Sequence, residues 1–270
     1  MTLNIDSDSC NRCGICSTVC PMGVITPANK TTPPVLPEKK QSACISCGQC
    51  EVFCPPGAIT VGNPGRKAEK GWNGKDMPPD LLDIYLKSRR SIRNYLAEPV
   101  SRDTILSLLD IARYAASGGN GQPVEWLVME DREDVKKVAA LTIEWMQTLV
   151  GTPHPMSGYI PSLVSAWDAG VDVICRGAPH LLFAHVPEDN PMAQVDGIIA
   201  LTHVDVAAPA FGVGTCWGGF VAMAGRSHQP LMEMLHLPKG RIPLYAMMFG
   251  YPRFKPLNIP ERKPLSVTWY

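Results

Sequence analysis

Two cysteine runs in the first 60 residues constrain this chain more than any other feature. Residues 10–25 read CNRCGICSTVCPMGVI, and residues 44–59 read CISCGQCEVFCPPGAI. Both follow the pattern C-x2-C-x2-C-x3-C-P, with a glycine after the second cysteine and Gly-x-Ile at the end. The two runs are an internal duplication, so each copy is expected to be one structural unit.

The spacing predicts two [4Fe–4S] clusters. Three closely spaced thiolates on one tight loop hold one cubane, and in two-cluster ferredoxins the fourth cysteine of the run ligates the other cluster. Zinc and plain thiols are the alternatives, but structural zinc sites favour two separated C-x2-C pairs. We therefore assign one cluster to Cys10, Cys13, Cys16 and Cys54, and the other to Cys44, Cys47, Cys50 and Cys20.

Composition narrows the class of protein further. The 270 residues are enough for roughly two domains, and 25 basic residues balance 25 acidic ones. This balance gives no reason to expect nucleic acid or an anionic membrane as a partner. The start of the chain lacks the basic and apolar regions of an export signal, and no apolar run is long enough to span a membrane. Crowded cysteines without such a signal favour metal ligation in a reducing compartment, so we expect a soluble, cytoplasmic protein.

The chain is expected to divide into three parts. Residues 1–62 form the cluster-binding domain, 63–79 a linker rich in Gly, Pro and charge, and 80–270 a larger domain. The proline-rich stretch between the cysteine runs, 21–43, is expected to be a solvated hairpin or loop.

The larger domain alternates helical and strand patterns, which predicts a mixed α+β fold. No G-x-G-x-x-G joins a strand to a helix and no GxxxxGK[ST] occurs, so a Rossmann site and an NTPase phosphate loop are unsupported. One helix is expected to start at Pro78–Pro79–Asp80. A second is expected to follow a cap at Ser101, with apolar positions as far as Ala115 or Ala116. Three more are expected over 131–150, 161–176 and 192–212. The segment 192–212 is apolar nearly all round, which indicates a buried central helix. The strands are expected over 124–130, 179–186 and 241–251.

Four motifs follow in order along this domain: RRSIR (89–93), ASGGNGQPVEW (116–126), GVGTCWGGF (212–220) and ERKP (261–264). The ordered set resembles the nitroreductase family of FMN-dependent oxidoreductases, and most closely the subgroup with an N-terminal double-cluster ferredoxin domain. The resemblance implies an FMN domain with a mixed sheet flanked by helices, in an intertwined homodimer, behind a small bacterial ferredoxin-like domain.

The resemblance assigns Arg89, Arg90, Ser91 and Arg93 to the phosphate and ribityl region of FMN. Guanidinium groups recognise phosphate through paired N–H donors, so the chemistry fits. The plainer interpretation is a solvated basic helix end. Arg262 matches a late basic residue that also reaches the phosphate, with Lys263 and Arg253 as weaker candidates.

Two Gly-rich segments complete the expected FMN site. The resemblance implies that Ser117, Gly118 and Asn120 touch the flavin across the dimer interface; the plainer interpretation is a helix end and a loop. It also implies that the backbone amides of Gly214, Thr215 and Cys216 lie beside the isoalloxazine, unless the segment is only a strand-to-helix turn.

No protein side chain is expected to be catalytic, because the flavin N5 does the chemistry in such sites. Cys175 and Cys216 are expected to be small buried residues, Arg176 is a further candidate flavin contact, and none of the six histidines is assigned.

Clusters move single electrons and a flavin handles one or two. We therefore expect an iron–sulfur flavoprotein that passes electrons from the clusters to FMN and, as hydride, to a nitroaromatic, quinone or similar electron-poor molecule. Reduced ferredoxin or NAD(P)H is the expected donor. The alternatives are an electron-transfer or flavin-holding protein without substrate turnover, and a dehalogenase-like or flavin-fragmenting enzyme of the same fold.

Overall fold

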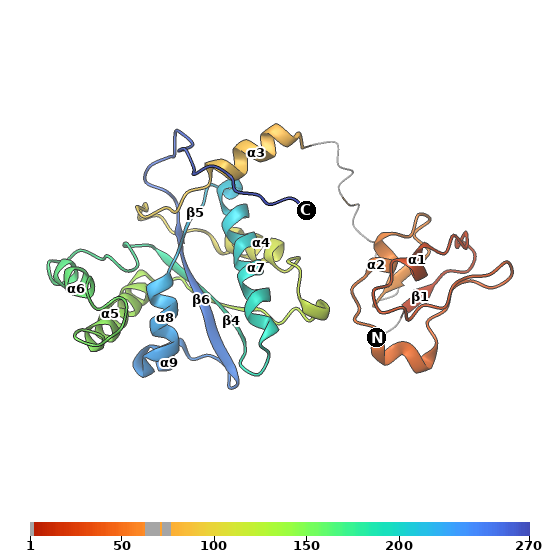
Figure 1. Ribbon diagram of the computed structural model, residues 1–270, viewed down its shortest axis with the longest axis horizontal. Helices are drawn as coiled ribbons and strands as arrows, with labels where there is room; N and C mark the ends of the chain where they lie inside the picture. The colour runs from red at the N-terminus through yellow and green to blue at the C-terminus, as the bar shows by residue number, and fades with distance from the viewer. Residues whose placement is uncertain (1–2, 63–70, 72–76) are drawn as a thin grey trace. The chain divides into compact units, whose positions relative to one another are not determined.

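The computed structural model describes residues 3–62, 71 and 77–270. The chain divides into two compact units, Met1–Asp76 with Gly119–Gly121, and Met77–Gly118 with Gln122–Tyr270 (Figure 1). The predicted linker lies outside the described residues except for Gly71 and the positions from Met77 onward.

The smaller unit carries the sequence duplication into its backbone. Two short helices, α1 (Ile15–Thr18) and α2 (Gln49–Val52), each follow a glycine in the left-handed region, with φ of 78° at Gly14 and 73° at Gly48. A side chain at this φ is strained, which explains the glycine after the second cysteine of each run. The duplication is therefore structural as well as sequential.

The ends of the smaller unit meet in a short antiparallel pair, β1 (Leu3–Ile5) with β2 (Ile59–Val61). Between the cysteine runs, Thr26 and Val35 form an isolated antiparallel bridge, as expected of a hairpin. The 3-10 helix η1 (Glu38–Ala43) then leads into the second run.

The larger unit alternates helices and strands, as the sequence pattern predicts. Its elements in chain order are α3 (Pro79–Ser88), α4 (Arg102–Ala112), β3 (Glu125–Met129), α5 (Arg132–Thr148), α6 (Ile160–Asp168), β4 (His180–Pro187), α7 (Met192–Ala207), η3 (Ala208–Phe211), β5 (Gly214–Trp217), α8 (Gly219–Ser227), α9 (Gln229–Leu235) and β6 (Arg241–Gly250). The 3-10 helix η2 (Gly118–Asn120) begins at the last residue of this unit before the insertion Gly119–Gly121, which belongs to the smaller unit.

The strands form a four-stranded sheet in the order β3-β4-β6-β5, and every neighbouring pair in it is antiparallel. The resemblance implied a mixed sheet, which contains parallel as well as antiparallel pairs. A parallel strand in this sheet would have to come from a segment other than these four strands. Helices cover both faces: α5, α8 and α9 lie on one side in Figure 1, and α4 and α7 on the other.

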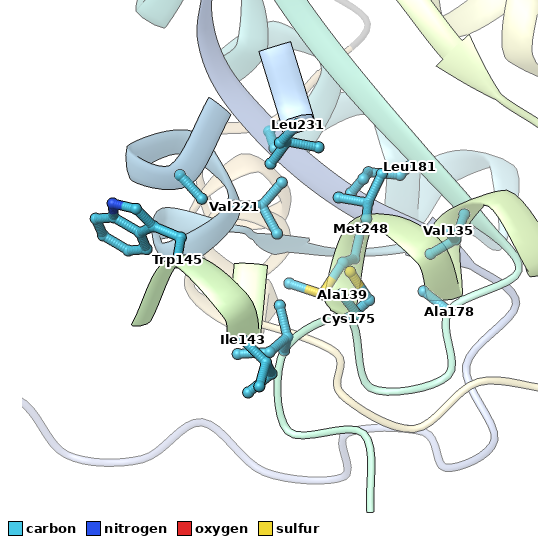
Figure 2. Close-up of a cluster of buried hydrophobic side chains, with 14 of the residues drawn as sticks. Val135, Ala139, Ile143, Trp145, Cys175, Ala178, Leu181, Val221, Leu231 and Met248 are labelled. Carbon is cyan, nitrogen blue, oxygen red and sulfur yellow. The ribbon is translucent and has the colours of Figure 1, made fainter. Parts of the chain in front are cut away.

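Two apolar clusters follow from this three-layer arrangement. Alternate residues of a strand point to opposite faces, so Leu181 and Phe183 of β4 join the cluster under α5 and α8, whereas Leu182 and Ala184 join the one under α4 and α7. Figure 2 shows the first cluster, to which α5 contributes Val135 and Ile143 and α8 contributes Val221.

Two helix starts agree with their sequence signals. The Ser101 hydroxyl accepts a hydrogen bond from the Thr104 amide at 3.2 Å and begins α4. The Asp131 carboxylate accepts from the Glu133 amide at 2.7 Å and begins α5. Such caps satisfy amides that the helix itself leaves unpaired.

Three expectations about helices were wrong in part. The helix expected over 161–176 ends at Asp168, because Gly170 turns the chain with φ of 82°. Helix α4 ends before Ala115 and Ala116. Helix α7 is not buried all round in this chain: Met192 and Val195 are exposed, whereas its acids Asp196 and Asp205 are buried.

Among the helices of the described residues, none combines the length and the apolarity needed to cross a bilayer.

One buried histidine makes stability depend on pH. His180 begins β4, is 1% exposed, stacks on Phe249 and accepts the Val100 amide at Nε2, 2.9 Å away. Burial lowers the pKa of His180 below 6.5, so the folded chain keeps the ring neutral. The unfolded chain takes up this proton first, and stability is therefore complete above about pH 6.5 and falls as the pH drops.

We expect His180→Gln to reduce this pH dependence, because Gln can still accept the Val100 amide but does not titrate. The measurement is the urea midpoint at about pH 7.5 and about pH 5.5 for both proteins. Equal losses of stability in wild type and variant would contradict the role of His180.

Candidate functional site

The predicted thiol sets gather in the smaller unit around two separate pockets. Residues of both runs line each pocket, so each fourth cysteine shares a pocket with the three thiols of the other run. One pocket is lined by Cys10, Cys13, Cys16 and Cys54, and the other by Cys20, Cys44, Cys47 and Cys50. Eight thiols in two sets of four fit the donor chemistry of two cubane clusters.

The surroundings of these sulfurs act in both directions: burial raises the pKa of Cys16, and it raises the pKa of Cys50 to about 11. Burial raises the pKa of the Cys20 thiol, but the backbone N–H groups from Met22 to Ile25 outweigh it and lower the pKa overall. In the other set, the Ala58 amide donates to Cys54 Sγ at 3.2 Å. Hydrogen bonds to the sulfurs stabilise thiolate ligands and tune the clusters they hold.

In the larger unit, the RRSIR segment runs extended along β5. Helix α3 ends at Ser88, and Arg89 has an extended backbone. The Ile92 amide donates to the Thr215 carbonyl at 2.8 Å, which ties the segment to the strand. The arginines therefore follow the helix rather than form its basic end.

Two guanidinium N–H groups of this segment lack an acceptor. Arg89 Nη1 and Arg90 Nε are buried without a hydrogen-bond partner among the described residues. Leaving a buried charged donor unpaired is costly. An anion such as a phosphate would supply the missing acceptors, so these residues fit the group that the sequence assigns to them.

Gly214 permits this close approach. A Cβ there would lie 2.5 Å from Ile92 Cγ1 and 2.9 Å from Pro252 Cγ, closer than side chains tolerate. Only glycine lets the segment and the strand meet in this way.

The backbone amides of β5 point to alternate sides of the strand. In an antiparallel ladder, the N–H and C=O groups of successive residues point to alternate sides. The Gly218 amide donates to Ala246 of β6, and the Thr215 carbonyl faces Ile92 instead. By this alternation the Gly214 and Cys216 amides face β6. The flavin contacts expected of Gly214, Thr215 and Cys216 stay predictions. The Thr215 amide remains on the arginine side.

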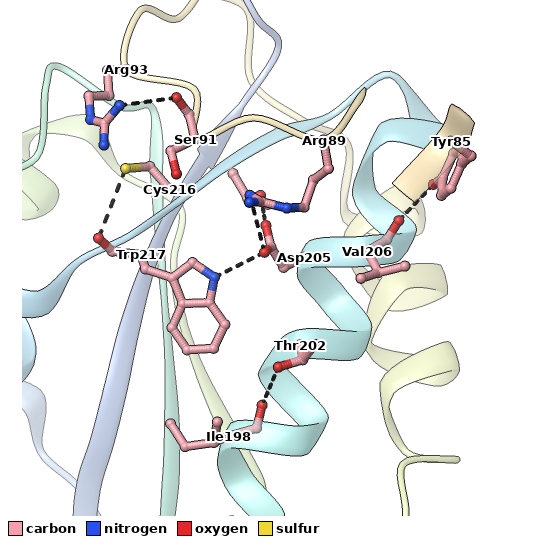
Figure 3. A network of polar contacts seen from close by, with 11 residues as sticks. Tyr85, Arg89, Ser91, Arg93, Ile198, Thr202, Asp205, Val206, Cys216 and Trp217 are labelled. Atoms are coloured by element: carbon pink, nitrogen blue, oxygen red, sulfur yellow. Dashed lines mark hydrogen bonds and ion pairs between the residues drawn. The ribbon is translucent and has the colours of Figure 1, made fainter. Parts of the chain in front are cut away.

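A buried carboxylate joins the arginine segment to β5 and α7. Asp205 accepts hydrogen bonds from the Thr215 hydroxyl and, at 3.0 Å, from Trp217 Nε1. Its Oδ2 also lies 3.4 Å from Arg89 Nη1 (Figure 3). Tyr85 fixes the end of α3 nearby, since its hydroxyl donates to the Val206 carbonyl at 2.6 Å.

Cys216 is a buried thiol that feels the charges of three arginines. Burial raises the pKa of its thiol, and the charges of Arg93, Arg176 and Arg89 offset this only in part. Burial also raises the pKa of Cys175, so both thiols stay protonated and are buried as expected. The charge of Arg176 partly offsets the rise in the pKa of Cys216, so Arg176 lies near this thiol and near the arginines of the RRSIR segment.

The model of the nitroreductase family matches residues 86–251, which is most of the chain. The chain belongs to the nitroreductase family. A 4Fe–4S dicluster domain model matches residues 9–59 of this nitroreductase-family chain, which covers both cysteine runs.

Curated relatives and solved structures are consistent with this family. An FMN reductase [NAD(P)H] of Bacillus subtilis is 31% identical over 170 residues, or 62% of this chain and 64% of its own length. This chain thus spans just under two thirds of that relative. A putative NADH dehydrogenase/NAD(P)H nitroreductase of Archaeoglobus fulgidus is 30% identical over 64% of this chain and 85% of its own length.

The crystal structure of a nitroreductase with bound FMN from Desulfitobacterium hafniense aligns with a TM-score of 0.58 at 19% identity. It covers 72% of this chain and 100% of that one. The larger unit therefore has the α+β nitroreductase fold that the motifs indicated.

The start of the SGGNGQP loop, Ser117 and Gly118, lies apart from the arginines. The Gly118 amide donates to Asp196 Oδ1 at 3.0 Å, and Ser117 Oγ accepts from the Gln122 amide at 3.0 Å. Asp196 and Asp205 are nine residues apart on α7, which is about 14 Å along the helix. Within one chain, Ser117 and Gly118 thus lie at the other end of α7 from Arg89. Asn120 follows with a φ of 56°.

The late basic residues lie in an exposed tail. Every residue from Arg253 to Tyr270 is exposed, including Arg262 and Lys263. The Arg253 amide donates to the Asn94 carbonyl at 2.9 Å, close in sequence to the RRSIR segment. The role assigned to Arg262 stays a prediction.

Sequence reasoning missed the two acids of α7. The signal was present, because Asp196 and Asp205 are ionisable residues inside an otherwise apolar segment, and a buried acid requires partners. Trp217 was given no role from the sequence, yet its indole N–H donates to Asp205.

We expect Gly214→Ala to separate the RRSIR segment from β5 and lower stability by roughly 1–3 kcal/mol, because the added methyl overlaps Ile92. The measurements are the urea midpoint and the hydrogen exchange of the Ile92 amide. Gly225→Ala in α8 is the control: its nearest contact is 3.6 Å, and it should be neutral or stabilising. Equal behaviour of the two variants would refute the close approach.

Proposed function

We propose that this nitroreductase-family chain is an iron–sulfur flavoprotein oxidoreductase that holds two [4Fe–4S] clusters and one FMN. When bound, these groups supply one-electron transfer through the clusters and hydride transfer from FMN to a nitroaromatic, quinone or similar electron-poor acceptor. The observation that supports the proposal is that one chain contains two four-thiol pockets and two neighbouring arginines, each with a buried N–H group that has no hydrogen-bond acceptor among the described residues.

The chain's own residues bind and orient in this proposal. The eight cysteines hold the clusters, and Arg89, Arg90, Ser91 and Arg93 hold the FMN phosphate and ribityl region, with Arg262 as a later contribution. The Thr215 amide lies on the arginine side of β5, where a donor stabilises charge on a reduced ring. No side chain is required as a catalytic acid.

A homodimer completes the site. The Gly118 amide binds Asp196, whereas Arg89 lies beside Asp205, nine residues further along α7. A second copy would bring this loop, with Asn120, over the ring. The exposed apolar side chains of α7, Met192, Val195 and Ile198, offer surface for such a contact.

The proposed setting is the cytoplasm, where reduced thiols favour cluster ligation over disulfides. The proposed donor is reduced ferredoxin or NAD(P)H. The names of the Bacillus and Archaeoglobus relatives, which mention NAD(P)H, support the second.

Anaerobically purified protein should contain about eight irons and about one FMN per chain. Arg89→Ala with Arg93→Ala should release the flavin and leave the iron count unchanged, because the two cofactors use separate units. Arg102→Ala with Arg113→Ala removes the same charge from exposed ion pairs and is the control. Full FMN retention in the first variant would reject the phosphate assignment, and colourless protein would reject the whole proposal.

A nitroaromatic distinguishes the enzyme from a carrier. Protein reduced by dithionite or by ferredoxin should turn over the nitroaromatic in the steady state, faster than the same amount of free FMN. Turnover no faster than free FMN would favour the electron-transfer or flavin-holding alternative. Product analysis over a substrate panel would identify a dehalogenase-like or flavin-fragmenting activity.

A further inference from the structure

Asp205 is an unusual residue for its position. It stands in an apolar helix, and its side chain is only 8% exposed. A carboxylate buried to this degree needs compensation. It has three partners from two other segments: the Thr215 hydroxyl, Trp217 Nε1 and the Arg89 guanidinium.

The three contacts differ in kind. Thr215 and Trp217 donate hydrogen bonds, one to each carboxylate oxygen. Arg89 Nη1 lies 3.4 Å from Oδ2, and it makes no hydrogen bond there. Asp205 thus attracts the guanidinium by charge while leaving its N–H donors available to another acceptor.

We propose that Asp205 is a positioning residue that holds Arg89 ready for the phosphate of FMN. The inference rests on the proposed function, in which Arg89 binds that phosphate. Arg89 is 29% exposed and follows a helix end, so without the carboxylate its long side chain is free to turn into solvent. Ordering such a side chain at the moment of binding costs affinity.

Charge repulsion acts in the opposite direction, because a carboxylate near a phosphate weakens binding. Two features limit this cost. The Thr215 and Trp217 donors compensate part of the Asp205 charge. Arg93 and Arg176 add positive charge close to Cys216, the residue that follows Thr215 in β5. The orientation of Arg89 is therefore the larger effect of Asp205.

Asp205→Asn tests the charge with little change in shape. The amide oxygen can accept from Trp217, and the amide NH2 can donate to the Thr215 hydroxyl, which accepts as well as it donates. Both hydrogen bonds therefore persist, and only the attraction for Arg89 is lost.

The readout is the preference for FMN over riboflavin, which lacks the phosphate. Full-length protein with intact clusters is stripped of flavin and titrated with each flavin by fluorescence quenching. We expect Asp205→Asn to weaken FMN binding about tenfold and riboflavin binding less than about twofold. A general structural defect would weaken both equally.

Asp196→Asn is the matched control, since it changes another buried acid of the same helix that contacts Gly118 rather than Arg89. Its FMN preference should match that of wild type. Trp217→Phe removes one hydrogen bond from Asp205 but keeps the charge, and it should also retain the preference. If Asp205→Asn folds poorly, Asp205→Glu keeps the charge and should retain more of the preference than Asp205→Ala.

A double-mutant cycle identifies the route of the effect. Arg89→Ala should lower the FMN preference, and adding Asp205→Asn to it should have no further effect, because Asp205 acts through Arg89. Additive losses, or an unchanged or increased preference in Asp205→Asn, would overturn the inference. If wild type binds FMN no better than riboflavin, the phosphate site itself fails, which is a failure of the proposed function.

Discussion

The larger unit depends on two central strands that bury apolar side chains on both faces. Along β4 and β6, alternate residues belong to opposite clusters, so neither face tolerates water. Such strands require helices on both sides. The helices then occupy the faces of the sheet. A polar site can therefore form only at the ends of the strands or at an edge of the sheet. The arginine segment lies beside β5, an edge of the four-stranded sheet.

This edge accepts the arginine segment in place of a fifth strand. Ile92 donates to Thr215 as a neighbouring strand would, and Gly214 removes the side chain that would keep the two apart. The segment covers an edge that would otherwise pair with another chain. It also brings Arg89 to Asp205, a residue of the helix that covers one face. The same arrangement therefore protects the sheet and assembles the cationic site.

Local signals predicted much of this structure. The cysteine spacing, the cap at Ser101 and the alternating elements follow from interactions within a few residues, and the structure contains them. The end of α6 was missed because it depends on a loop in which the Asp172 carboxylate accepts the amides of Ile174, Cys175 and Gly177. The role of Asp205 was missed because its partners are distant in the sequence. The apolar character averaged over the whole segment conceals Asp205. Its partners come close only when β5 and the segment after α3 pack against α7.

The charge of the smaller unit bears on why both cofactor sites would share one chain. Residues 1–60 contain four basic and four acidic side chains, so they carry no net charge to steer an encounter with a redox partner. Separate carriers often rely on such steering, which salt weakens. A covalent connection makes the encounter intramolecular and removes its dependence on protein concentration. A neutral domain of this kind is thus a poor free carrier but an adequate tethered one, which supports the proposed electron delivery within the chain.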